Sequence, residues 1–239
     1  FEMSRTDFVH SQTLSACFRQ RLMIERPVVP TADGSLTLWD ERTGQHYHSL
    51  HGARRESEHV FIKNGLDPFL GKEDLRILEL GFGTGLNALL ACIWAQKHQM
   101  PVRYLSCDLY PLDRRDFIDS ADPSEKAVWH QLLDGPWGEE IRIDKYFFLK
   151  KERCDIRSLV GHHEAFDTVF HDAFSPDSEP ELWTLDVFQS MYAALKGNGS
   201  WVSYSAKGQV RRDLQTAGFV VERLEGPPGK REMLRGWKK

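Results

Sequence analysis

The sequence predicts one α/β domain built on a mostly parallel sheet, and three observations predict it. Its 239 residues are enough for one α/β domain of ordinary size and leave little room for two. Short apolar runs alternate with amphipathic stretches, as in parallel strands that helices cover on both faces. The last two apolar runs are joined by four turn residues, too few for a crossover helix, so they are expected to pair as an antiparallel hairpin.

The front of the chain differs from the rest. Residues 1–75 are predicted to form an extension that packs on the main domain, residues 76–239. Within the extension, residues 35–39 are expected to form a strand and residues 56–66 a helix. The first residue is not Met, so the numbering is expected to begin inside a fragment, with Met23 as a candidate native start.

The main domain is predicted element by element from residue 76. Apolar runs predict strands at 76–80, 102–109, 141–149, 166–171 and 200–205, followed by the hairpin strands at 218–224 and 230–235. Helical periodicity predicts helices at 86–94, 123–133 and 209–217, and residues 195–199 are interpreted as a turn. A seven-stranded, mostly parallel sheet that ends in such a hairpin resembles the Rossmann-like class I S-adenosylmethionine-dependent methyltransferases.

A glycine-rich loop follows the first of these strands. Its glycines, Gly81, Gly83 and Gly85, have the pattern GxGxG, whereas a dinucleotide-binding loop needs a glycine where this chain has Leu86. No lysine follows, as it would in a phosphate-binding P-loop. Ligands of open α/β sheets bind beyond the carboxyl ends of the strands, so these glycines are expected to let the backbone approach S-adenosyl-L-methionine closely.

Three carboxylates near strand ends are candidate cofactor ligands. Glu79 lies inside an apolar strand and is expected to hold the methionine ammonium, directly or through water, or to brace the loop; the alternative is a frayed strand end. Asp108 ends the second strand, where a carboxylate accepts hydrogen bonds from ribose hydroxyls, although it could also cap a turn. Asp155 is expected to accept from the adenine amino group, or to pair with Arg153 instead.

The fourth strand leads into the candidate transfer site, residues 171–176. An amine must be neutral to attack a methyl group and must lose a proton, so Asp172 is the candidate catalytic residue, orienting the N–H and accepting that proton. Phe174 is expected to stack on a flat base and Pro176 to stiffen the loop. A plain Asp-x-x-Ser-Pro turn is the alternative interpretation.

Successive motifs of the sequence, in order, resemble the methyltransferase domain of the bifunctional tRNA 5-methylaminomethyl-2-thiouridine biosynthesis proteins and its single-domain relatives. The motifs are ELGFGTGLN at 79–87, DAFSP at 172–176, PELWT at 180–184, YSAKGQVRR at 204–212, AGF at 217–219 and KREM at 230–233. The resemblance places Phe82, Thr84 and Asn87 in the cofactor-binding loop with the glycines. It also extends to residues 48–57, where Glu56 either faces the cofactor or begins a helix.

The resemblance implies methyl transfer from S-adenosyl-L-methionine to the aminomethyl nitrogen on C5 of the tRNA wobble (2-thio)uridine. The bifunctional members continue into a flavin-dependent oxidoreductase domain, whereas this sequence ends at Lys239 without a second glycine fingerprint. The chain is therefore expected to use no FAD and to start from the aminomethyl form. A separate oxidoreductase or an upstream modification enzyme is then the partner that the chemistry calls for.

Charge is distributed unevenly along the chain. The net charge of −4 argues against general coating of nucleic acid, yet residues 205–239 hold nine Lys and Arg against four Asp and Glu. Together with the resemblance, this basic end is expected to contact the phosphates of a tRNA anticodon loop, from which an unpaired base reaches the pocket. The candidate residues are Lys207, Arg211, Arg212, Lys230 and Arg231, with solvated side chains as the alternative.

Cysteine and histidine usage predicts no metal site. The four cysteines form no CxxC pair, which is typical of thiols in a reducing cytosol. The histidines at 46, 48 and 51 and the pair at 162–163 lack cysteine or carboxylate neighbours at metal-ligand spacing. No stretch approaches the roughly 18 apolar residues of a membrane span, so a cytoplasmic protein without a membrane partner is expected.

Two other functions remain open from the sequence. The first is a methyltransferase of the same class that acts on a small-molecule or protein amine. The second is a non-catalytic scaffold that binds S-adenosylmethionine or tRNA; the intact GxGxG loop, Asp108 and Asp172 argue against it. Steep salt dependence of binding would favour a tRNA substrate over a metabolite.

Overall fold

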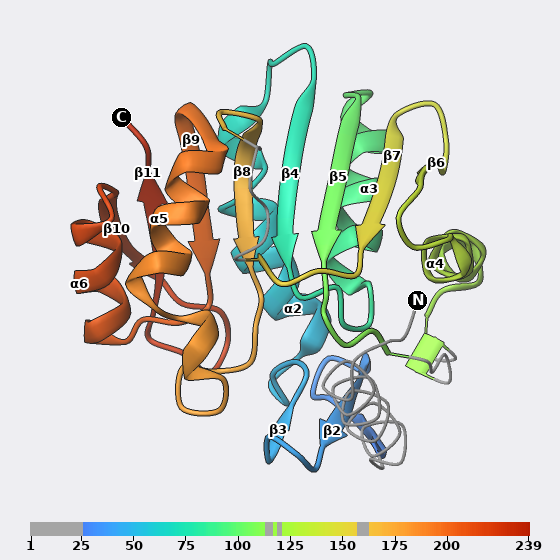
Figure 1. Cartoon of the computed structure of the whole chain (residues 1–239). Helices are drawn as coiled ribbons and strands as arrows, with labels where there is room; N and C mark the ends of the chain where they lie inside the picture. Colours follow the sequence, from blue (N-terminus) through green and yellow to red (C-terminus); the bar gives the residue numbers. More distant parts are fainter. Residues whose placement is uncertain (1–25, 113–116, 119–120, 157–162) are drawn as a thin grey trace, which may run out of the picture.

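The computed structural model describes residues 26–239 except 113–116, 119–120 and 157–162. The candidate start at Met23 therefore lies outside the described residues. The described part of the chain forms one large mixed sheet flanked by helices and one small antiparallel sheet below it (Figure 1). The predicted α/β class is confirmed.

In the described part of the chain, the large sheet has eight strands, one more than the seven predicted. In spatial order they are β10 (Val220–Glu225), β11 (Glu232–Trp237), β9 (Leu195–Ser203), β8 (Phe166–His171), β4 (Leu75–Leu80), β5 (Val102–Cys107), β7 (Phe147–Glu152) and β6 (Glu140–Arg142). The strands β9, β8, β4, β5 and β7 run parallel. Their carboxyl ends meet at the lower edge of the sheet in Figure 1.

The central strand β4 shows why these residues form a buried strand. Leu75 and Ile77 pack into the core on one face of the sheet, and Leu78 and Leu80 pack on the other. A strand covered on both faces needs a continuous apolar run rather than an alternating one. The chain leaves β4 toward β5 on one side and reaches β8 on the other, so β4 lies where the strand order reverses, the usual ligand position in such sheets.

The C-terminal hairpin is confirmed. Strand β11 pairs antiparallel with β10 and also with β9, so it lies between them inside the sheet. The turn at 226–229 contains two prolines between two glycines, which excludes a helix at this point.

Helices cover both faces of the sheet. They are α2 (Ala53–Ser57), which continues as the π-helix η1 (Glu58–Lys63), then η2 (Asp67–Phe69), α3 (Leu86–His98), α4 (Pro123–Asp134), η5 (Pro180–Leu182), α5 (Leu185–Ala194) and α6 (Gly208–Thr216). Helices α5 and α6 lie in front of the sheet in Figure 1, and α3 lies behind it. Each face has its own apolar core, one built with η1, α3 and α4 and the other with α5 and α6.

Three elements differ from the sequence prediction. The expected strand at 141–149 is two strands, β6 and β7, because the Asp144 carboxylate accepts hydrogen bonds from the backbone N–H groups of Tyr146 and Phe147 and turns the chain. Helix α5 was not predicted, although its buried side chains recur with helical spacing. The expected turn at 195–199 is a bulge at the start of β9, with Asn198 at φ 61°.

The described residues ahead of β4 contain a small sheet of β1 (Val28–Pro30), β2 (Leu36–Asp40) and β3 (Gln45–His46). The strand expected at 35–39 corresponds to β2, whose Leu38 is buried in the core shared with α3. In Figure 1, β2 and β3 lie below the carboxyl ends of the parallel strands. The small sheet therefore faces the edge of the large sheet at which a ligand is expected.

Candidate active site

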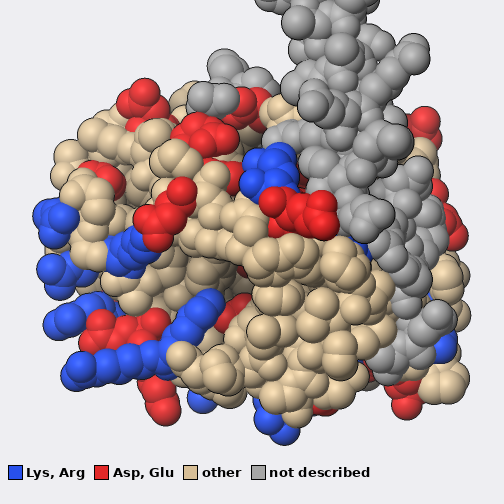
Figure 2. All heavy atoms as spheres, turned by 90° about the horizontal axis from the view of Figure 1, so that it is seen from below, with Lys and Arg blue, Asp and Glu red and all other residues tan. Residues whose placement is uncertain are grey.

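A cavity of about 570 Å³ lies at the carboxyl ends of the parallel strands. The loops after β4, β5, β7, β8 and β9 form one side of it. The other side is formed by Arg26, Glu56 and most of residues 39–50, with Lys230 of the C-terminal hairpin. Figure 2 views this end of the molecule and shows the hollow with acidic and basic side chains around it. Its volume is sufficient for a nucleoside-sized ligand.

The glycine loop forms part of the cavity wall. Gly81, Gly83 and Gly85 all have positive φ, which non-glycine residues rarely adopt. A Cβ atom on Gly81 would lie 2.7 Å from the Asp172 carbonyl oxygen, so the loop can pass this close to the β8 loop only without a side chain. Gly81, Gly83 and Phe82 line the cavity, and Gly85 precedes α3 as its N-cap.

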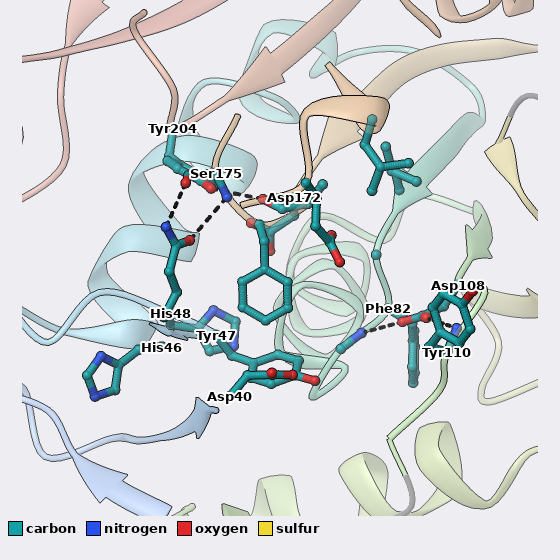
Figure 3. Close-up of a pocket in the computed structure, with 18 of the residues that line it drawn as sticks. Asp40, His46, Tyr47, His48, Phe82, Asp108, Tyr110, Asp172, Ser175 and Tyr204 are labelled. Carbon is teal, nitrogen blue, oxygen red and sulfur yellow. Dashed lines mark hydrogen bonds between the residues drawn. The ribbon is translucent and has the colours of Figure 1, made fainter. Parts of the chain in front are cut away.

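The two aspartates predicted to hold the nucleoside also line the cavity. Asp108, just after β5, accepts hydrogen bonds through Oδ2 from the Gly83 N–H (3.1 Å) and through Oδ1 from the Tyr110 N–H (2.8 Å). The Asp108 carboxylate is therefore held against the glycine loop beside Tyr110, as Figure 3 shows. Asp155 follows β7, the neighbouring strand. Their contacts with ribose and adenine stay predictions.

The structure places Glu79 behind the cavity rather than in its wall. Glu79 is fully buried and accepts hydrogen bonds from the Ser106 hydroxyl (2.7 Å) and the Asn87 side-chain amide (3.1 Å). Burial raises its pKa to about 8, so the carboxyl group is mostly protonated at neutral pH. Glu79 thus supports Asn87, which itself lines the cavity.

Asn87 connects two carboxyl groups. Its side-chain nitrogen donates to Glu79 and also to Asp172 Oδ2, the latter at 2.7 Å. Its carbonyl oxygen Oδ1 is buried and has no hydrogen-bond partner among the described residues. Because buried polar atoms are nearly always paired, this oxygen suits a ligand donor such as an ammonium group.

Asp172 lies at the end of β8, next to the glycine loop, and faces the cavity. Burial and, to a smaller extent, the negative charge of Glu56 raise its pKa, the hydrogen bond from Asn87 and the charge of Lys230 lower it, and the net result is a pKa of about 7. A carboxyl group with this pKa is a suitable proton acceptor at neutral pH. In Figure 3 it lies between Ser175 and Tyr204 on one side and Asp108 and Tyr110 on the other.

Sequence reasoning missed the roof of the cavity, which we define as residues 42–48. The Gln45 side chain donates to the Ser175 hydroxyl (2.6 Å) and accepts from the Ser175 N–H (3.2 Å), which joins β3 to the β8 loop. The ring of Tyr47 packs edge-on against Phe174, with the ring centroids 4.9 Å apart. Phe174 is therefore a cavity residue, as predicted, but its ring contacts Tyr47.

His48 joins the roof to the glycine loop. Its Nε2 atom lies 2.9 Å from the Thr84 hydroxyl, and both side chains are buried. Burial lowers the pKa of His48 to about 4, so the ring is neutral at physiological pH. Thr84 is thus tied to His48 and lies outside the cavity lining. The only sequence signal for this contact is that His48 belongs to the family-like stretch at 48–57, and that stretch alone assigns His48 no role.

The basic residues predicted to meet RNA divide into two groups. Lys230 lines the cavity, where it pairs with Glu56. Lys207 pairs with Asp177, Arg212 donates to Gln209 (2.7 Å), and Arg231 is exposed. These three, with the half-buried Arg211 and Pro176, lie outside the cavity lining. In Figure 2, Lys and Arg gather at the left edge, the side that holds α6 and the C-terminal hairpin in Figure 1.

Within the described ranges, no group of three or more His, Cys, Asp or Glu side chains could hold a metal ion. The ring of His46 packs edge-on against Trp39, whereas His48 is hydrogen-bonded to Thr84. These two histidines of the sequence cluster therefore have different partners and do not point to a common site. No helix among the described residues is long and apolar enough to cross a membrane.

Comparison with known proteins gives three findings. Residues 119–239 match a family model described as S-adenosyl-L-methionine-dependent methyltransferase. The chain is 31% identical, over 87% of its length, to the tRNA 5-methylaminomethyl-2-thiouridine biosynthesis bifunctional protein MnmC of Azoarcus sp.. It is 30% identical, over 83% of its length, to the protein of that name from Nitrosospira multiformis. It covers 36% and 35% of these proteins, so it spans about a third of their length.

Solved structures share the fold. The crystal structure of MNMC2 from Aquifex aeolicus superposes with a TM-score of 0.73 at 28% sequence identity, covering 100% of this chain and 79% of that one. A spermidine synthase from Thermotoga maritima superposes with a TM-score of 0.54 at 14% identity, covering 89% of this chain and 68% of that one. The second likeness concerns the fold alone.

Proposed function

Since the chain belongs to the S-adenosyl-L-methionine-dependent methyltransferase family, we propose that it methylates the 5-aminomethyl nitrogen of 2-thiouridine at the tRNA wobble position. The product would be 5-methylaminomethyl-2-thiouridine, the nucleoside in the name of its bifunctional relatives. The observation that carries this proposal is Asp172, a carboxyl group with a pKa of about 7 that faces the cavity beside the glycine loop.

The residues present fit the methyl donor. The positive-φ glycines give the donor close access to the backbone, and the buried Asn87 Oδ1 has no partner among the described residues and can accept from the ammonium group. Asp108 and Asp155 would accept from the ribose and the adenine. When bound, S-adenosyl-L-methionine supplies a methyl group on a positively charged sulfur.

Asp172 would prepare the acceptor. A primary alkyl amine is largely protonated at neutral pH and has no free lone pair in that form. The Asp172 carboxylate would take one proton from the ammonium, which leaves a neutral amine beside the methyl donor. The nitrogen–carbon bond would then form as the carbon–sulfur bond breaks, which leaves the product as a protonated secondary amine. Asp172 would release the proton that it took to solvent and return to the carboxylate form.

The charge of the cavity suits a cationic acceptor and a cationic donor. Of the residues that the structure describes, seven Asp and Glu line it, against three Lys and Arg. Such a lining attracts ammonium and sulfonium groups and repels phosphates. The phosphates of a tRNA would therefore stay outside, near the exposed side chains of Arg212 and Arg231, while the base alone enters.

The proposed substrate sets the cellular context. A free aminomethyl group must be supplied by an enzyme that builds the side chain of the wobble base or trims a longer one to the amine. We therefore propose a cytoplasmic enzyme, working where tRNA is modified, after an upstream modification enzyme or a separate oxidoreductase.

Incubation with labelled S-adenosyl-L-methionine and bulk tRNA that lacks the modification tests the proposal. Nucleoside analysis should show the label in 5-methylaminomethyl-2-thiouridine, and the labelling should require Asp172. Label in another nucleoside would contradict the proposed acceptor. Label that appears only in proteins or small molecules of an extract would favour the alternative amine substrates.

A further inference from the structure

An ion pair on the cavity wall joins two distant parts of the chain. Lys230 Nζ donates to Glu56 Oε2 at 2.6 Å, and the two residues are 174 positions apart. The side chains are 33% and 8% exposed, and both residues line the cavity. Glu56 Oε1 also accepts from the Ser49 N–H at 3.1 Å, so the carboxylate is fixed on both of its oxygens.

The hairpin turn directs Lys230 inward. The Lys230 N–H donates to the Pro227 carbonyl at 2.9 Å, and Gly229 has φ 85°. A Cβ atom on Gly229 would lie 2.1 Å from the His51 ring, so the turn packs directly against the segment that leads to Glu56. By contrast, the next residue, Arg231, is exposed.

Tyr204 fixes the lysine next to the transfer site. The Lys230 ammonium lies 3.8 Å from the centroid of the Tyr204 ring, within the range of a cation–π contact. The Tyr204 hydroxyl donates to the carbonyl of Ala173, the residue after Asp172, at 2.9 Å. Lys230 and Asp172 are therefore held on one continuous stretch of the wall.

The ammonium of Lys230 has donors to spare. A lysine ammonium has three N–H groups that can donate hydrogen bonds and no atom that can accept one. In the described part of the chain it makes one hydrogen bond, to Glu56. Its positive charge also lowers the pKa of Asp172. A ligand that places an amine at Asp172 would thus meet a fixed hydrogen-bond donor close by.

We propose that Lys230 donates a hydrogen bond to the ring carbonyl adjacent to the aminomethyl arm and so selects uracil, with Glu56 and Tyr204 as the residues that position it. The inference rests on the proposed function. In a 5-aminomethyl pyrimidine the arm is on C5 and the neighbouring substituent is on C4. Uracil has an acceptor oxygen at C4, whereas cytosine has an amino group that only donates, and two donors cannot pair.

Anticodon stem-loops that carry 5-aminomethyluridine or 5-aminomethylcytidine at the wobble position test this inference. The wild-type protein should prefer the uridine by about 10- to 100-fold in kcat/KM, the range expected for one hydrogen bond to a charged donor. Lys230→Met should lose most of that preference, because its activity on uridine falls while its low activity on cytidine does not. Lys230→Arg keeps a donor and should recover part of it.

Glu56→Gln tests the positioning role. Without its anionic partner Lys230 should select uridine less well. The acidic limb of the pH profile should move to lower pH, because the charge of Glu56 no longer raises the pKa of Asp172. Among the described residues, the other titratable groups that interact with Asp172 are Glu79, Lys230 and the hydroxyls of Tyr104 and Tyr204, and none of these residues is replaced in this variant.

Lys97→Met is the matched control, since Lys97 is exposed at the far end of α3 from the glycine loop. It should leave both rates unchanged, and S-adenosylhomocysteine affinity verifies that each variant is folded. A Lys230→Met variant that still prefers uridine as strongly as wild type overturns the inference. If that variant fails to fold, unchanged selectivity and pH profile in Glu56→Gln overturn it. A wild-type protein inactive on both stem-loops overturns the proposed function itself, and this inference with it.

Discussion

At the scale of single residues, Asp172 combines burial with a position on the cavity wall. Its pKa of about 7 means that the protonated and ionised forms coexist near neutral pH, and Glu79 behind it, with a pKa of about 8, is mostly protonated. Both carboxyl groups contact the same amide, that of Asn87. Such a cluster costs folding free energy, which is typical of groups that are kept for chemistry rather than for stability.

Asp172→Asn should separate the cost of the buried carboxyl group to stability from its contribution to catalysis. The carboxyl ionises near pH 4 in the unfolded chain and near pH 7 in the folded one, so the folded state loses stability as pH rises between them. A pKa difference of about three units corresponds to about 4 kcal/mol, and 1 kcal/mol shifts the melting temperature of a domain of this size by about 2–4 °C. Removing the titrating group should therefore raise the melting temperature by about 10 °C at pH 8 and have little effect at pH 4. Methyl transfer should fall by about 100-fold or more.

Differential scanning calorimetry across pH measures the first effect and a labelled-methyl assay the second. Asp74→Asn, which replaces an exposed carboxylate at the amino end of β4, should change neither. A variant at Asp172 whose melting temperature follows that of wild type at every pH would contradict the assignment of its pKa.

At the scale of elements, the cavity depends on contacts between the extension and the loops of the large sheet. His48 from the extension meets Thr84 of the glycine loop, and Gln45 meets Ser175 of the β8 loop. Helix α4 supports the same glycine loop from the other side, because the Trp129 indole donates to the Thr84 carbonyl at 2.8 Å. The glycine loop is thus held from two elements that do not precede or follow it directly.

Thr84→Val should weaken this arrangement without changing the volume of the side chain. The ring nitrogen of His48 would lose its hydrogen-bond partner in a buried place, at a cost of about 1–3 kcal/mol. Urea denaturation should show that loss, and calorimetry should show weaker binding of S-adenosylhomocysteine. Thr84→Ser keeps the hydroxyl and should retain most of both; equal losses in the two variants would show that packing, not the hydrogen bond, matters at Thr84.

The part of the site that could be predicted from the sequence is the part encoded by short spacing. The GxGxG loop and the aspartates at 108 and 172 follow apolar runs directly, so local pattern and the geometry of parallel sheets place them at one edge. The roof could not be found in this way. Gln45 and Ser175 are 130 residues apart, and their contact depends on how the small sheet docks.

Because local pattern carries no information on contacts between distant segments, the sequence could not show that the basic residues divide between the cavity and the surface. Lys230 and Arg231 are neighbours in a basic motif, and nothing in their composition distinguishes them. The turn geometry at Gly229 and the partner Glu56 turn Lys230 into the cavity, while Arg231 stays exposed. Likewise, the strand expected at 141–149 was continuous in its apolar pattern, and a single aspartate side chain, Asp144, divides it.

At the scale of the whole molecule, the acidic cavity and the basic end at 205–239 are separate features. The exposed Arg212 and Arg231 belong to the basic end, outside the cavity lining. Replacing both by Ala should reduce the slope of log affinity against log salt for tRNA by about 1–2, since each single-strand phosphate that an arginine neutralises adds roughly 0.7 to that slope. Cofactor affinity should not change.

Filter binding of tRNA over a range of potassium concentrations measures that slope. Arg103→Ala is the control, because Arg103 pairs with Glu140 at the amino end of the parallel strands, away from the cavity. If Arg103→Ala lowers the slope as much as the double variant does, the basic end has no special role in RNA binding.

The place of β11 within the sheet affects how the protein is made. Because Glu232–Trp237 pair with both β9 and β10, a nascent chain that has emerged only as far as residue 231 leaves the edge of β9 open and β10 without its neighbour. An open strand edge of this kind invites pairing with other chains. Ribosome-bound intermediates should therefore depend on chaperones until this strand emerges, and premature termination in the last few codons before it should yield aggregates rather than a slightly shortened enzyme.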